Sequence, residues 1–145
     1  MLMKKLFLTG IAALLLAAGA AHAETIKELL VSTGLATGQV PTVTDGDTVK
    51  IVGMRIRLTD YDSPELFSPK CPSERELAWK AKQELERIIG QVQLKLVPCA
   101  TSNYGRLCAE GSINGKALAT HMIGLGLGSP YVCRPGHCPA KRSWC

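Results

Sequence analysis

Aromatic residues and long hydrophobic runs are both scarce in this sequence. Two Phe, two Trp and three Tyr make up 5% of the 145 residues, which is few for a platform that stacks on nucleic-acid bases. The one long apolar run stands at the N-terminus, so a polytopic membrane protein is excluded. Repeats and low-complexity tracts are absent after residue 23. With 46% hydrophobic and 20% charged residues, the chain is expected to fold as a single globular domain.

Residues 1–23 have the three parts of a secretory signal peptide. An apolar run follows Lys4 and Lys5, and Ala21–Ala23 has the small-x-small pattern of a cleavage site. An uncleaved membrane anchor is the alternative, but the short, Ala-rich run favours cleavage before Glu24. We therefore expect an exported protein, periplasmic or secreted, with no stable membrane association after cleavage and with one domain over residues 24–145.

The charge that remains is mildly basic. Cleavage removes two lysines and no acid from a net charge of +5, which leaves +3. This balance permits a polyanionic partner without requiring one.

Cysteine is infrequent in this sequence but informative. The six cysteines all follow the signal peptide: Cys71, Cys99, Cys108, Cys133, Cys138 and Cys145. An even number in an exported chain predicts disulfides, and six cysteines allow fifteen pairings. Cys99 and Cys108 flank a turn between two strand-like runs, so we expect them to pair. Zinc binding by the tail, which also holds His137, is the alternative; its spacing is not a familiar zinc pattern, and an oxidising compartment favours disulfides.

The hydrophobic pattern changes period along the chain. Residues 24–38 are ambiguous, with Ile26, Leu29 and Leu30 able to face a core from a short helix. A strand is expected around residues 39–44. Alternating apolar and polar residues on both sides of Gly53 then predict a tight hairpin with one buried face.

The clearest helix begins at Ser73. Ser73 and Glu76 form a capping-box pattern, an apolar stripe follows, and Gly90 stands at the stop position. The stripe consists of Leu77, Ala78, Ala81, Leu85, Ile88 and Ile89. Strands are expected over residues 92–96 and 106–113, and a second helix over 117–123. This order indicates an α+β domain, and a small barrel with packed helices fits it.

Acidic residues gather in one part of the chain. Five fall within about twenty residues, around Arg55 and Arg57: Asp45, Asp47, Asp60, Asp62 and Glu65. Each alone is better read as a turn former. Together, clustered carboxylates suit a hard cation such as Ca²⁺, and neighbouring arginines suit a phosphate, because guanidinium is planar, charged and bidentate.

Several segments, in order, resemble the staphylococcal-nuclease (thermonuclease) family. Val43–Val49 contains its Asp-Gly-Asp-Thr signature, and Arg57–Glu65 resembles its Arg-(x)₄-Asp-Thr/Ala-Pro-Glu segment. Asn103–Arg106 resembles its Lys/Arg-Tyr-Gly-Arg turn, and residues 114–127 resemble its last helix. The resemblance implies an OB-fold, a five-stranded β-barrel with packed helices, and Ca²⁺-dependent hydrolysis of DNA and RNA to 3′-phosphate products by a monomer.

The resemblance also assigns roles to single residues. These are Asp47, Asp62 and the backbone carbonyl of Ser63 as Ca²⁺ ligands, Glu65 as general base, Arg57 and Arg106 as catalytic phosphate-binding arginines, and Tyr104 as a substrate-binding aromatic residue. Asp45 is expected to support Asp47 from the turn. The Cys-rich tail over residues 132–145 departs from the family pattern, which continues with a helix there.

Two other functions stay open. The chain could be a disulfide-stabilised OB module that binds single-stranded nucleic acid without cleaving it, or a calcium-stabilised structural domain. The scarcity of aromatic residues and the acidic cluster favour the enzyme over the binding module, and the paired arginines have no role in a purely structural domain.

Overall fold

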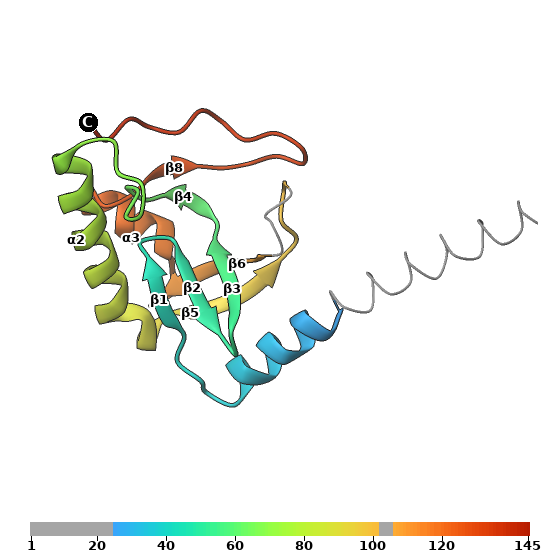
Figure 1. Ribbon diagram of the computed structural model, residues 1–145. Helices are drawn as coiled ribbons and strands as arrows, with labels where there is room; N and C mark the ends of the chain where they lie inside the picture. Colours follow the sequence, from blue (N-terminus) through green and yellow to red (C-terminus); the bar gives the residue numbers. More distant parts are fainter. Residues whose placement is uncertain (1–24, 102–105) are drawn as a thin grey trace, which may run out of the picture.

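The structure, a computed structural model, describes residues 25–101 and 106–145 (Figure 1). The predicted signal peptide therefore lies outside the described residues, as does Tyr104. After a helix over residues 25–36 the elements are β1 (Thr42–Asp45), β2 (Thr48–Ile51), β3 (Met54–Leu58), β4 (Asp60–Asp62), α2 (Pro72–Ile88), the 3₁₀ turn η1 (Ile89–Gln91), β5 (Gln93–Val97), β6 (Leu107–Ile113), β7 (Lys116–Ala117), α3 (Leu118–Gly124) and β8 (Ser129–Tyr131).

The strands form a mixed sheet and a separate pair. The sheet has the order β1-β2-β3-β6-β5, with β7 added to β6, and β4 pairs with β8. Only the β3–β6 pairing is parallel within the described residues; the others are antiparallel. The α+β class is confirmed. Strand pairing among the described residues does not close a barrel, because β1 and β5 are the two ends of the order.

The predicted hairpin is confirmed. Strands β2 and β3 pair with Val49 opposite Ile56, and both side chains are fully buried. Val52 and Gly53 make the turn with φ of 50° and 75°, the left-handed pair of angles that a two-residue hairpin turn needs. The register places Thr48 opposite Arg57, so the strand ends that carry Asp47 and Arg57 meet at one edge.

Helix α2 packs on β1 with the predicted stripe, but its start differs from the prediction. Ala78, Ala81, Leu85 and Ile88 are buried. The helix begins at Pro72, whose fixed φ and missing N–H suit the first helical position, and no side chain caps it. The capping box of Ser73 and Glu76 was therefore wrong; Glu76 pairs with Lys80 instead. Gly90 lies inside η1, so the helix tightens there rather than ending at a glycine.

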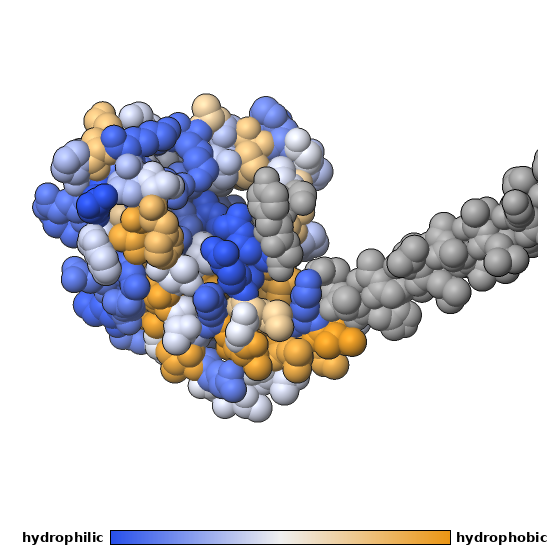
Figure 2. All heavy atoms as spheres, viewed as in Figure 1, coloured by the Kyte–Doolittle hydropathy of each residue, from blue (hydrophilic) through white to orange (hydrophobic). Residues whose placement is uncertain are grey.

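The N-terminal helix faces the core differently from the prediction. Ile26, Leu29 and Leu30 are exposed, and Val31 is the residue that is fully buried. Figure 2 shows an apolar patch where this helix joins the rest of the molecule. No helix within the described residues is long and apolar enough to cross a membrane.

All six cysteines form disulfides, as an exported protein would. The predicted Cys99–Cys108 pair is confirmed, and Cys71–Cys145 and Cys133–Cys138 complete the set. Each cysteine sulfur of the tail is thus bonded to a second sulfur and is not a thiolate available to zinc. The Cys71–Cys145 bond joins the start of α2 to the end of the tail, which brings the tail back over β4 and β8 (Figure 1).

Candidate active site

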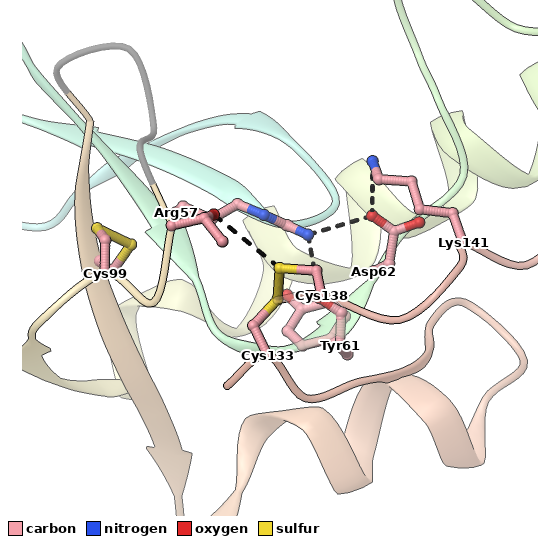
Figure 3. The surroundings of a disulfide bond; sticks show 9 residues. Arg57, Tyr61, Asp62, Cys99, Cys133, Cys138 and Lys141 are labelled. Carbon is pink, nitrogen blue, oxygen red and sulfur yellow. Dashed lines mark hydrogen bonds and ion pairs between the residues drawn. A yellow bond between two sulfur atoms is a disulfide. The ribbon is translucent and has the colours of Figure 1, made fainter. Parts of the chain in front are cut away.

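Arg57 lies between two of the predicted ligand carboxylates. Its Nη1 forms an ion pair with Asp47, and its Nη2 lies 3.1 Å from Asp62 Oδ1. The two nitrogens also donate to the carbonyl oxygens of Asp47 and Tyr61 at 3.3 and 3.2 Å. The Arg57 and Asp62 side chains are only 12% and 3% exposed. Asp47 and Asp62, fifteen positions apart, therefore share one largely dehydrated charge cluster. Figure 3 shows the Arg57–Asp62 part of this cluster.

The turn before β2 sets the position of Asp47. Asp45 Oδ1 accepts a hydrogen bond from the backbone N–H of Asp47 at 3.1 Å, which confirms Asp45 as a supporting turn residue. Gly46 is required for space rather than for a left-handed angle, since an added Cβ would lie 2.7 Å from the Cβ atoms of Ala81 and Ser63. The buried Tyr61 hydroxyl donates to the Gly46 carbonyl at 2.7 Å.

The Asp47 carboxylate is satisfied on both oxygens. Thr48 Oγ1 donates to Oδ1 at 3.1 Å, and the Ser63 N–H donates to Oδ2 at 2.9 Å. Burial opposes ionisation of Asp47, but the positive charge of Arg57 and the Ser63 N–H together lower its pKa. Asp47 is therefore the firmly ionised member of the cluster.

The pKa values of the neighbouring acids shift in the opposite direction. Burial, followed by the negative charge of Asp47, raises the pKa of Asp45 to about 6. The same two causes raise the pKa of Asp62, against the opposing effect of Lys141 and Arg57. At Asp45 and Asp62, burial and the negative charge of Asp47 together thus outweigh the nearby cationic side chains.

Asp62 leads directly into the segment that carries Glu65. Ser63 is buried, and Pro64 biases it toward an extended conformation. The backbone N–H of Glu65 donates to Glu74 Oε1 at 3.2 Å, and that of Lys70 donates to Glu74 Oε2 at 2.6 Å. Glu74, in the first turn of α2 and 3% exposed, therefore holds the loop after Glu65.

A cavity of about 340 Å³ brings five predicted site residues together. Its walls include Asp47, Arg57, Ser63, Glu65 and Arg106. Asp62 does not line it directly but contacts Arg57. Tyr131, Cys133 and Cys138 also line the cavity.

Three residues that contribute to the site were not predicted from the sequence. Lys141 reaches Asp62 Oδ1 at 3.0 Å and Glu65 Oε1 at 3.2 Å from the tail, and Figure 3 shows its ammonium above the Asp62 carboxylate. Glu74 and Tyr61 fix backbone around the site. Glu74 follows the Cys-Pro pair at the helix start, a position that could have suggested a loop contact; nothing local distinguishes Lys141 from a solvated lysine.

The described residues contain no group of three or more His, Cys, Asp or Glu side chains arranged to hold a metal ion. The carboxylates that converge, those of Asp47 and Asp62, do so around Arg57.

Comparisons with known proteins do not assign the chain to a family. No protein-family model matches it, and no curated protein matches it.

Proposed function

We propose that the chain is an exported, Ca²⁺-dependent nuclease that hydrolyses phosphodiester bonds of DNA and RNA and leaves 3′-phosphate ends. The observation that carries the proposal is the Asp47–Arg57–Asp62 cluster at the wall of a cavity that Glu65 and Arg106 also line. The fold would be an opened relative of the OB barrel, with the β1–β2–β3 meander as the part that the two have in common.

The donor chemistry fits a hard cation. Asp47 and Asp62 offer carboxylate oxygens, and the Ser63 main chain lies against Asp47. The raised pKa values of Asp45 and Asp62 indicate negative charge that a further cation would stabilise. Asp47, Asp62 and the Ser63 carbonyl would hold Ca²⁺, which supplies positive charge to a phosphate oxygen when bound.

The chain's own groups supply the rest of the chemistry. Arg57 and Arg106 would bind the phosphate and stabilise the charge that develops as phosphorus becomes five-coordinate. Glu65, with a side chain 43% exposed toward solvent, would orient a water or accept its proton for in-line attack. Tyr104 would contact the nucleotide.

One observation favours the non-cleaving alternative. Arg57 pairs with both Asp47 and Asp62, as the cation of a structural ion-pair network would. A binding module for single-stranded nucleic acid therefore stays the second candidate.

A cleavage assay separates the two candidates. The purified chain with its disulfides formed is mixed with single-stranded DNA, duplex DNA and RNA, in Ca²⁺ or in chelator. Cleavage in Ca²⁺ alone, with 3′-phosphate ends, supports the nuclease; retention of intact nucleic acid on a gel, with no products, supports the binding module.

Variants then test the arginines. Arg57→Ala or Arg106→Ala should lower kcat by about 10²–10³-fold, the usual cost of removing one preorganised donor. Arg55→Ala, an exposed arginine two residues from Arg57 on β3, is the matched control and should cleave like the parent chain. Parent-level activity in either of the first two variants would remove that arginine from the mechanism.

A further inference from the structure

The tail after β8 is fastened to the domain at two places. Near its start, Cys133 bonds to Cys138 around a turn whose Gly136 N–H donates to the Ala100 carbonyl at 2.8 Å. At its other end Cys145 bonds to Cys71. The residues between Cys138 and Cys145 are consequently held at both ends rather than attached at one.

Lys141 stands between these two attachments. Its ammonium contacts one carboxylate from β4 and one from the loop that follows, Asp62 at 3.0 Å and Glu65 at 3.2 Å. It also lies 5.9 Å from the centre of the Tyr131 ring, which lines the same cavity. The tail thus delivers one positive charge to two predicted site residues.

Glu65 depends on this contact more than Asp62 does. Asp62 is 3% exposed and also pairs with Arg57, whereas the Glu65 side chain is 43% exposed. Among the described residues Lys141 is the one ion-pair partner of the Glu65 carboxylate. Glu74 fixes the Glu65 backbone, but it leaves the side-chain torsions free, and an exposed Glu samples several rotamers.

We propose that Lys141 is a positioning residue for Glu65, holding its carboxylate beside Asp62 at the cavity wall, and that the Cys71–Cys145 bond makes this possible by returning the tail to the site. The inference rests on the proposed function for its catalytic consequence. The positioning itself does not depend on that function, since it is a contact between two side chains.

Kinetics on a short single-stranded oligonucleotide test the consequence. Lys141→Ala should lower kcat about tenfold to a hundredfold, the range that misplacing a reacting group costs, while KM changes less than twofold. Lys141→Arg, which keeps a cation of similar reach, should recover most of the loss. Lys80→Ala, which removes an exposed lysine paired with Glu76 on α2, is the matched charge control and should match the parent.

A double-mutant cycle shows whether Lys141 acts through Glu65. In a Glu65→Gln background, Lys141→Ala should cause no further loss of kcat. A full additional loss would mean that Lys141 acts on something else and would overturn the proposal, as would parent-level kcat in Lys141→Ala itself.

A spectroscopic measurement tests the contact without catalysis. In the full chain labelled with ¹³C at glutamate side chains, Lys141→Ala and the Cys71→Ser/Cys145→Ser pair should both shift the Glu65 δ-carboxyl resonance, and Lys80→Ala should not. An unmoved Glu65 resonance overturns the positioning role. A parent chain that never cleaves nucleic acid while this resonance shifts would instead refute the proposed function and keep the contact.

Discussion

Two walls of the cavity are built by different means. The sheet wall is formed by Asp47, Arg57 and Tyr61, and Asp62 contacts it through Arg57. These residues come from the turn before β2, from β3 and from β4, and their side chains are nearly all withdrawn from water. The tail wall, residues 132–145, has no helix, and its Lys141 side chain is half exposed. One disulfide, Cys133–Cys138, closes a turn within the tail, and a second, Cys71–Cys145, attaches the end of the tail to the start of α2. Burial fixes the first wall and covalent bonds fix the second, so different perturbations should break each.

Arg57→Ala should have the largest effect on the sheet wall. It would leave Asp47 and Asp62 buried without their shared counter-ion, a change that typically costs about 3–5 kcal/mol of folding free energy. Urea unfolding would measure it. Arg55→Ala should stay within about 0.5 kcal/mol of the parent, and an Arg57→Ala loss no greater than this would show that the ion pairs contribute little.

Removing one disulfide of the tail wall at a time should rank the two bonds by their contribution to the free energy of unfolding. Cys71–Cys145 spans 74 positions and Cys133–Cys138 spans 5. Chain entropy then gives about 4 kcal/mol for the first and about 2 kcal/mol for the second. Serine pairs at each bond, compared by thermal unfolding, check the ranking. Equal losses would indicate that loop closure does not set the stability of this wall.

Gly46→Ala should disturb the sheet wall through packing. The new Cβ would meet backbone-attached carbons of Ala81 and Ser63 at 2.7 Å, and such overpacking typically costs about 1–3 kcal/mol. Gly90→Ala is the control, because nothing lies within 4 Å of its added Cβ. Similar unfolding midpoints for the two variants would contradict the close approach at Gly46.

Asp45→Asn should change the stability of the sheet wall in a way that depends on pH. The folded-state pKa of about 6 exceeds the ordinary 3.8, so between these values the folded chain binds more protons than the unfolded one. Asp45 therefore lowers stability progressively as pH rises through this window. The variant should be more stable than the parent at pH 7.5, by at most about 3 kcal/mol, because each pKa unit corresponds to about 1.4 kcal/mol.

The gain should vanish near pH 4, where Asp45 is protonated in the folded parent. Unfolding curves at both values would measure the difference. A gain that is the same at pH 4 and pH 7.5 would assign the effect to something other than ionisation of Asp45.

Local pattern predicted the regular parts of the fold well. The hairpin around Gly53 and the buried stripe of α2 follow from periodicity, which is a property of neighbouring residues. Strands β4 and β8 were missed because each has three residues and exists through its distant partner. The capping-box prediction was wrong because the helix begins at Pro72, which is a favourable first helical residue, so Ser73 lies inside the helix and does not cap it.

The difference between features set by neighbouring residues and features set by distant partners also applies to the candidate site. Asp47, Arg57 and Asp62 lie in one short stretch, so motif and charge pattern could identify them together. The position of Lys141 depends on the Cys71–Cys145 bond. Six cysteines allow fifteen pairing schemes, and the sequence did not predict this bond. Burial around Glu74 likewise depends on how α2 meets the loop, which no local rule gives.

The short span of the Asp47–Arg57–Asp62 cluster has a consequence for the order of folding. Its members come from two adjacent hairpin strands and their flanks, so little chain entropy is lost in bringing them together. Lys141 must cross 79 positions to meet Asp62 and needs an oxidant to be kept there. A newly synthesised chain would therefore assemble the buried charges first and acquire its last cation only when the oxidation of Cys71 and Cys145 is complete.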